Sequence, residues 1–265
     1  MDKAEAAEFA MLLEVCTDCK PGNIDRFHDY DDTKLQHFLN SAVCSRSVFE
    51  EIDKLSLGEG IYNAVLKTNG HSGGNTHFGA FILLIPLLKG DGITGAKAAV
   101  KHTSVEDAVM FYKAFGLTQV RMNKTDDLDV NDPASIDKLR EDKMTLYDVM
   151  KYSAENDMVA REWTNGFELT RKAAGILIEK GPGYSSISEM FITMMAEYPD
   201  TFIAKKFGHE KSISVMNRAK EVIAGKLSQG DFDNELLSEG ANPGSLADIC
   251  IAAIFTALLE GWNWD

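Results

Sequence analysis

The sequence predicts an all-α fold, a multi-helix bundle in a single domain with a central buried helix. Three observations predict it. Apolar residues recur at helical spacing along most of the 265-residue chain. Residues 78–88 are apolar almost throughout, as in a helix that is buried on all sides. Strand patterns are nearly absent, since only residues 116–123 have moderate β character, and we expect a short extended connection there.

The helices are expected in the following order. Apolar spacing predicts helices over 3–19, from a Thr33 cap to about 55, and over 57–68 and 76–89. A helix over 104–116 should open on a capping box of Ser104 and Asp107. The polar segment that follows is expected to be a loop with one short helix. Residues 145–181 should form one long helix or two, followed by a short helix after Asp200 or Thr201 and by helices over 185–197, 212–225 and 245–262.

No repeat, low-complexity tract or Ser/Pro-rich linker divides the chain, so we expect residues 1–265 to form one domain. The formal net charge is −14, which disfavours nucleic acid and anionic membranes as partners. An anionic ligand would therefore need a few local basic residues or a bound divalent cation. Residues 78–88 are too short to span a bilayer, which takes about 20 residues. Because residues 1–15 do not read as a secretory signal, a cytoplasmic location is expected.

Four polar segments carry more functional-looking residues than loops require. The first is KPGNIDRFHDYDDT, residues 20–33. Lys20 and Arg26 supply cations, and Asp25 and Asp29 supply hard oxygen ligands. This mixture suits a polyphosphate with Mg²⁺, which takes one or two carboxylates and phosphate oxygens. The alternative is a solvated acidic loop with Asp–Arg pairs. The nearby Cys16 and Cys19 are expected to be reduced thiols at a helix end.

The second segment is SGGNTHFGAF, residues 72–81. Its glycines permit a tight turn, and Asn75 or Thr76 can cap the following helix. Free amides at a helix start attract phosphate. His77 could donate to that phosphate or share a proton. The alternative is ordinary capping chemistry with His77 as a packed side chain.

The third and fourth segments are YPDTFIAKKFGHEKS and GANPGSLADICIAAIFTALLEG. Asp200 and Lys206 are the candidates in the third, which holds the densest basic cluster of the chain. In the fourth, Asn242 and Gly244 shape a turn, Ser245 should cap a helix, and Asp248 occupies its first turn. A solvated basic face and an Asp placed by the helix dipole are the alternatives. All four segments lie at helix starts or turns, and we expect them to converge on one pocket.

In order and spacing these segments resemble the triphosphoribosyl-dephospho-CoA synthase family. The resemblance rests on EVCTDCKPGNIDR, GGNTHFGA, PDTFIAKKFG and NPGSLADICIAAIFTALLEG, which together run from Glu14 to Gly261. Phe78 stands where bacterial members have Lys, and KKFG replaces Arg followed by glycines. These differences indicate a divergent, archaeal-type branch. Its acceptor is expected to be dephospho-CoA or a related cofactor precursor.

The resemblance implies an all-α enzyme with ATP as substrate and Mg²⁺ as the metal. In the implied reaction, the ribose 2′-hydroxyl of dephospho-CoA attacks the anomeric carbon of ATP and adenine leaves, through an oxocarbenium-like transition state. The matched blocks assign roles as follows: catalytic, Asp248, Asp200 and His77; substrate-binding, Lys20, Arg26, Asn75, Thr76, Lys206, Asn242 and Gly244; metal, Asp25 and Asp29.

Two other functions remain open at this point. One is a Mg²⁺-dependent hydrolase of ribosyl or nucleotide phosphates, which would use the same acidic helix ends with water as acceptor. The other is a non-catalytic helical binding protein, in which the polar ends are only caps. The sequence leaves the oligomeric state open and is compatible with a homo-oligomer.

Overall fold

The computed structural model describes residues 1–118 and 134–265, and these residues form helices without any strand. The all-α prediction is therefore confirmed. The acidic stretch 123–133 and most of the β-like stretch 116–123 lie outside the described residues. The helices are α1 (Lys3–Val15), α2 (Leu35–Glu50), η1 (Ile52–Lys54), α3 (Leu57–Thr68), α4 (Phe78–Lys89), α5 (Ile93–Lys101), α6 (Val105–Leu117), α7 (Ala134–Glu141), α8 (Leu146–Ser153), α9 (Met158–Asn165), α10 (Glu168–Lys180), α11 (Tyr184–Glu197), α12 (Thr201–Phe207), α13 (His209–Ile223), α14 (Gln229–Glu239) and α15 (Gly244–Leu259).

The prediction of one or two helices over 145–181 is wrong, because three helices occupy this stretch. The Asp157 side chain accepts hydrogen bonds from the backbone N–H groups of Val159 and Ala160, and so starts α9. The helix ends at Gly166, which has a left-handed φ of 80°. The sequence analysis also did not anticipate α5 and α14, which are short and polar on one side.

Two predicted caps are confirmed and two are wrong. Ser104 and Asp107 form the expected capping box, and Asp200 caps α12. Thr33 does not cap α2, because the helix begins two residues later. Ser245 does not cap α15, because the helix begins at Gly244. In both cases an aspartate from elsewhere in the chain accepts a hydrogen bond from the first turn.

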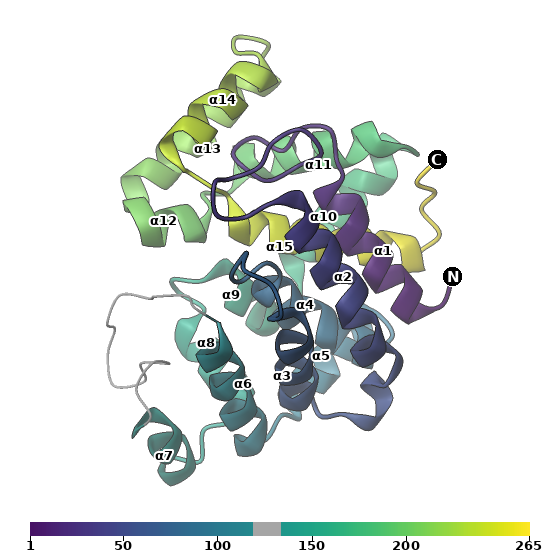
Figure 1. The fold of residues 1–265 in the computed structure, drawn as a ribbon, viewed down its shortest axis with the longest axis vertical. Helices are drawn as coiled ribbons and strands as arrows, with labels where there is room; N and C mark the ends of the chain where they lie inside the picture. The colour runs from purple at the N-terminus through teal and green to yellow at the C-terminus, as the bar shows by residue number, and fades with distance from the viewer. Residues whose placement is uncertain (119–133) are drawn as a thin grey trace.

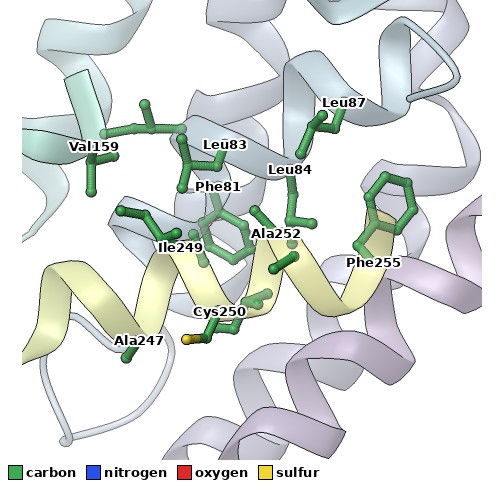
Figure 2. Close-up of a cluster of buried hydrophobic side chains, with 14 of the residues drawn as sticks. Phe81, Leu83, Leu84, Leu87, Val159, Ala247, Ile249, Cys250, Ala252 and Phe255 are labelled. Atoms are coloured by element: carbon green, nitrogen blue, oxygen red, sulfur yellow. The ribbon is translucent and has the colours of Figure 1, made fainter. Parts of the chain in front are cut away.

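The core is built on α4 and α15, two apolar helices that pack against each other. Phe81 and Leu84 of α4 lie against Ile249 and Ala252 of α15 (Figure 2). Each large apolar side chain buried here contributes about 1.5–3 kcal/mol relative to exposure. α4 is therefore the predicted central helix, and α15 shares that place.

Pro86 lies inside α4, where its nitrogen cannot donate to the carbonyl of Ile82. The indole Nε1 of Trp163 in α9 donates to this carbonyl instead, at 2.9 Å. The buried carbonyl is thus paired and α4 continues to Lys89. The indole also ties α9 to the central helix.

The remaining helices surround this pair. Figure 1 shows α12, α13 and α14 at one end of the molecule and α6 and α7 toward the other, with both chain termini on one side. α1 and α10 pack along α15, and α3 and α5 pack against α4. Among the described residues no single helix combines the length and apolarity needed to cross a membrane; α4 and α5 pass that test only as a pair bent by 102°. The helices that pack around α4 and α15 hold the amino ends of these two helices inside the bundle.

Candidate active site

Asp200 joins the amino ends of two helices. Its Oδ1 accepts hydrogen bonds from the backbone N–H groups of Phe202 and Ile203 in α12, at 2.7 and 2.9 Å. Its Oδ2 accepts one from the N–H of Leu246 in α15, at 2.8 Å. The side chain is buried, so its oxygens are committed to the backbone. Asp200 therefore fixes where α15 begins.

Asp248 joins α15 to α4. It is half-buried and is the fifth residue of α15, so the prediction that it occupies the first turn is wrong, because the helix begins before Ser245. It accepts a hydrogen bond from the backbone N–H of Ala80 in α4. Its carboxylate lies directly against Gly79, where an added Cβ would come within 1.9 Å of Oδ2. Only glycine permits this approach. Asp248 is thus the carboxylate that is held between two helix amino ends while remaining partly accessible.

A third aspartate, Asp157, stands near these two. It caps α9 through one oxygen, and its other oxygen lies 2.5 Å from the ammonium of Lys205. Its negative charge raises the pKa of both Asp200 and Asp248. The sequence does not single out Asp157, because it lies within the stretch 145–181, whose apolar spacing predicts one long helix or two.

The two site carboxyls hold protons more tightly than ordinary aspartates. Burial raises the pKa of Asp200 to about 6, against three backbone N–H groups that favour the ionised form. Burial raises the pKa of Asp248 well above its usual range, and the charges of Glu14, Asp200 and Asp157 raise it further. Such a shift toward neutral pH is typical of acid–base groups in enzymes, although structural networks show it too.

Lys20 is the basic residue of this centre, and it is buried with Glu14. Its ammonium lies 2.5 Å from the Glu14 carboxylate, and the two side chains are 1% and 2% exposed. Burial raises the pKa of Glu14, while the Lys20 charge opposes this. Glu14 was not among the predicted site residues, although it opens the EVCTDCKPGNIDR block. An acidic residue in the last turn of a helix normally suggests only a solvated position.

His77 lies at the amino end of α4 and is 1% exposed. Its Nδ1 lies 2.8 Å from Oγ of Ser41, and its Nε2 has no hydrogen-bond partner among the described residues. Burial lowers the pKa of His77 to about 3, and the Lys20 ammonium and His71 lower it further. His77 is therefore a neutral imidazole at pH 7. The Asn75 side chain accepts from the N–H of Phe78, but His77, and neither Asn75 nor Thr76, holds the N-cap position of α4. Thr76 is half-buried beside Asn75.

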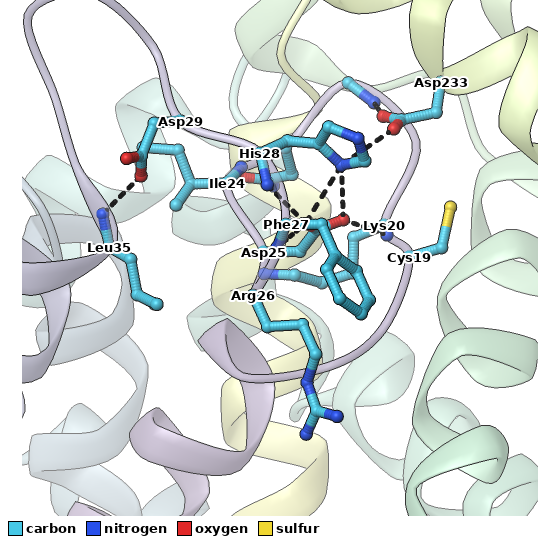
Figure 3. A network of polar contacts seen from close by, with 12 residues as sticks. Cys19, Lys20, Ile24, Asp25, Arg26, Phe27, His28, Asp29, Leu35 and Asp233 are labelled. Carbon is cyan, nitrogen blue, oxygen red and sulfur yellow. Dashed lines mark hydrogen bonds and ion pairs between the residues drawn. The ribbon is translucent and has the colours of Figure 1, made fainter.

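The loop of residues 16–34 is fastened to α14 by an acid–histidine network (Figure 3). Asp25 accepts from the N–H groups of Phe27 and His28, and Nδ1 of His28 lies 3.1 Å from Asp25 and 3.2 Å from Asp233. Asp233 also accepts from the N–H of Gly22, at 2.8 Å. Cys19, Asp25 and Asp233 place one ligand atom each within 4.8 Å of one another, which makes them a candidate metal group.

Asp29 does not join that group. It accepts a hydrogen bond from the N–H of Leu35, at 2.7 Å, and so starts α2. Arg26 is also engaged elsewhere: its Nε donates to the carbonyl of Cys16 and its guanidinium pairs with Asp18 at 2.9 Å. The predicted pair of metal ligands, Asp25 and Asp29, is therefore not brought together.

The turn before α15 holds the other predicted residues. Lys206 is exposed, and its ammonium donates to the carbonyl of Gly240 at 3.1 Å. Asn242 has a buried Oδ1 that meets no hydrogen-bond partner within residues 1–118 and 134–265, and Gly244 packs beside the ring of Phe202. Electrostatic coupling links Lys20 to His77, and Glu14 and Asp200 to Asp248. Lys20, His77, Asp200 and Asp248 thus form one centre, whereas Arg26, Asp29 and Lys206 contact other partners.

The fold and this centre together define an all-α protein with buried acid and base groups at converging helix amino ends. The ATP:dephospho-CoA triphosphoribosyl transferase family matches residues 1–265, so the chain belongs to that family and is a transferase. Among solved structures it is similar to an Archaeoglobus fulgidus protein provisionally assigned as a triphosphoribosyl-dephospho-CoA synthase. That match has 28% identity and a TM-score of 0.73 over 85% of this chain and 100% of the other. A search of curated proteins finds no match.

Proposed function

We propose that this chain moves the 5-triphosphoribosyl group of ATP onto the ribose 2′-hydroxyl of dephospho-CoA, or of a related cofactor precursor, and releases adenine. Membership of the family supports the reaction. The observation that carries it here is the placement of Asp248, a partly accessible carboxylate with a raised pKa at the meeting point of two helix amino ends. A cytoplasmic location, where ATP is abundant, fits this proposal.

Asp248 is the residue best placed to act on the acceptor. A carboxylate near the anomeric carbon can take the proton of the attacking hydroxyl or stabilise the ribosyl cation. Its raised pKa makes it a stronger base than an ordinary aspartate. Asp200 is not available to the acceptor in this way, since it is buried and accepts hydrogen bonds from three backbone N–H groups. We therefore assign Asp200 to positioning α15 rather than to contact with substrate.

The triphosphate would be held at the amino end of α4. The helix dipole favours anions there, and Asn75, Thr76 and His77 surround this end. The N–H groups of Phe78 and Ala80 already donate to Asn75 and Asp248, so a phosphate would bind them only by displacing those side chains. Lys20 adds a buried cation whose charge acts on His77. Because His77 is neutral, it can donate a hydrogen bond but is a poor source of a proton for adenine.

The turn before α15 would contact the nucleoside. The unpaired Oδ1 of Asn242 is an acceptor that suits a ribose hydroxyl or the adenine amino group. Gly244 keeps that turn small. Lys206 could add charge at the phosphates only by leaving the Gly240 carbonyl, and Arg26 only by leaving Asp18.

Mg²⁺ remains part of the proposal as the companion of ATP, but the predicted ligands do not fit it. Asp29 is a helix cap, and Asp25 lies with a thiol, whereas Mg²⁺ prefers oxygen ligands in octahedral geometry. We therefore expect Mg²⁺ to be held chiefly by the phosphate oxygens of ATP, where it would neutralise charge.

The test is an incubation of the protein with ATP, Mg²⁺ and dephospho-CoA, followed by chromatographic assay of adenine. Adenine should appear only when the acceptor is present. Asp248→Asn should lower turnover by about 10²–10⁴-fold, the range for losing a general acid–base group, with an unchanged circular dichroism spectrum. Adenine or phosphate release without acceptor would favour the hydrolase. Full activity of Asp248→Asn would reject its role.

A further inference from the structure

We infer that Phe202 determines specificity for an adenine base: its ring stacks on the base, and Oδ1 of Asn242 accepts a hydrogen bond from the amino group of the same base. The inference rests on the proposed function, in which ATP and dephospho-CoA each carry an adenine. Phe202 belongs to α12 and is 42% exposed. It lies beside the turn that leads into α15.

The ring of Phe202 and the amide of Asn242 meet at Gly244. A Cβ added to Gly244 would lie 3.4 and 3.6 Å from Cδ1 and Cγ of Phe202, and 3.7 Å from Oδ1 of Asn242. These are ordinary van der Waals distances, so the missing side chain leaves room for one ligand atom that touches both residues. Phe202, Asn242 and Gly244 are each partly accessible, so a ligand can reach this space from the surface.

Oδ1 of Asn242 is the acceptor beside this space. It is buried and finds no donor in the part of the chain that the structure describes, and an unpaired buried acceptor costs free energy. The exocyclic amino group of adenine supplies the missing donor, whereas guanine has a carbonyl oxygen at that position. An exposed aromatic ring next to such an acceptor suits a flat base, which stacks on the ring and is read along its edge.

The Phe202 ring is held close to Asp248. Asp200 accepts hydrogen bonds from the N–H groups of both Phe202 and Leu246, so one carboxyl group fixes the start of α12 against α15. Gly244 and Asp248 are four residues apart in α15, which places them on one face, about 6 Å apart along the axis. The three residues between them are buried. A base on Phe202 therefore has its ribose within reach of Asp248.

Adenine itself is the probe for binding, because it requires no turnover. Phe202→Trp keeps a stacking ring and adds a fluorophore, whose emission adenine should quench beyond any change in the wild type. The matched control is Phe207→Trp, at a second exposed phenylalanine of α12 whose ring lies 5.0 Å from the Lys206 ammonium. Its emission should not respond. Equal quenching in the two variants, or none in Phe202→Trp, would overturn the inference.

Three further variants test the parts of the base site by calorimetric titration with adenine. Phe202→Leu should weaken binding by about tenfold, as expected for the loss of one base stack, and Phe207→Leu should not. Gly244→Ala fills the space without strain, because Gly244 has no left-handed φ. It should weaken adenine binding while the urea midpoint stays the same or rises.

Hypoxanthine, which has a carbonyl oxygen in place of the amino group, tests the hydrogen bond. The wild type should bind adenine more tightly than hypoxanthine, and Asn242→Ala should abolish this preference. Equal binding of the two bases by the wild type would contradict the role of Asn242.

Turnover assigns the base to one substrate and separates this inference from the proposed function. Phe202→Leu should raise KM about tenfold for the substrate whose adenine stacks there, ATP or dephospho-CoA, and leave the other KM unchanged. Adenine binding that depends on Phe202, in a protein that never transfers the triphosphoribosyl group, would support the base site and reject the transferase. Turnover with both KM values unaffected by Phe202→Leu would reject the base site and keep the transferase.

Discussion

Gly79 and Asp248 make contact so closely that the glycine controls where the carboxylate lies. A Cβ at position 79 would overlap Oδ2 of Asp248, and the aspartate would have to rotate away. Gly79→Ala should therefore lower turnover by about 10²-fold, the cost of a misplacement of about 1 Å at a reacting group. The far end of a side chain can move aside and Ala favours helix, so the thermal unfolding midpoint should change little.

The matched control for Gly79→Ala is Gly175→Ala. Gly175 lies inside α10, and an added Cβ there meets nothing within 4 Å. This variant should keep full adenine-release activity and gain about 0.5–1 kcal/mol of stability from helix propensity. Equal activity in the two variants would show that the position of Asp248 does not matter.

Lys20 combines a structural and a functional role, and two variants separate them. Lys20→Met leaves Glu14 buried without a partner, which should cost about 3–5 kcal/mol in the free energy of unfolding. The double variant Glu14→Leu/Lys20→Met removes both charges and should recover most of that stability in urea titrations. Its adenine release should stay about 10–100-fold low, because the phosphate donor is gone. An active double variant would restrict Lys20 to a structural role.

At the level of single residues, the sequence identified those that stand in turns containing glycine or proline. Lys20, His77, Asp200 and Asp248 stand at glycine- or proline-containing turns, and the structure brings these four into one centre. Glu14, Asp157 and Asp233 were missed, because an acidic residue in a helix usually faces water and its partner is set by tertiary packing. Nothing local to Asp29 revealed that Leu35 would bind it.

Among the elements, α12 and α15 depend on one carboxyl group, Asp200, whose ionisation should affect stability. Its pKa is about 6 in the folded protein against 3.8 as the ordinary value. The folded state then binds the proton more tightly, so stability falls as the pH rises from about 4 to 6, by roughly 3 kcal/mol in total. Urea unfolding at several pH values should show this loss.

Asp200→Asn is the variant that isolates this contribution. An amide cannot ionise, so the part of the pH dependence due to Asp200 should vanish. Asn resembles the protonated Asp200, with one acceptor oxygen and one donor. The wild type and the variant should therefore differ least below pH 4 and most above pH 6, where only the wild type has lost stability through ionisation. A difference that does not vary with pH would contradict the raised pKa of Asp200.

Helix existence was predictable where apolar spacing was long and regular, as in α3, α4, α6 and α15. Helix breaks were less predictable. The stretch 145–181 keeps a helical pattern across Asp157 and Gly166, and only tertiary contacts of these residues decide that the chain turns there. α1 ends at Val15, four residues before the predicted end, with Cys16 as its C-cap.

At the scale of the whole molecule, the charge of −14 opposes the binding of a polyphosphate, so the affinity must come from the buried centre. If ATP binds the native state there, saturation at 100 times Kd with Mg²⁺ should stabilise the protein by about 2.7 kcal/mol. For a chain of this size the unfolding midpoint then rises by roughly 5–10 °C.

Adenosine, which lacks the phosphates, serves as the control in the same thermal scan and should raise the midpoint far less. Asp248→Asn should keep the shift with ATP, because its proposed role is in the chemistry rather than in phosphate binding. No shift with ATP would contradict a nucleotide site in this protein and favour helices that are merely capped.

Trp163 binds the carbonyl that Pro86 leaves unpaired, and this limits the order in which the two residues can change during evolution. An exchange of the tryptophan alone strands the Ile82 carbonyl in a dry interior, whereas an exchange of the proline alone gives that oxygen a second donor. Pro86 can therefore be replaced before Trp163 without leaving a buried carbonyl unpaired, but Trp163 cannot be replaced before Pro86. Across homologues, lineages without the proline should be free to vary the aromatic residue, and lineages that keep the proline should not.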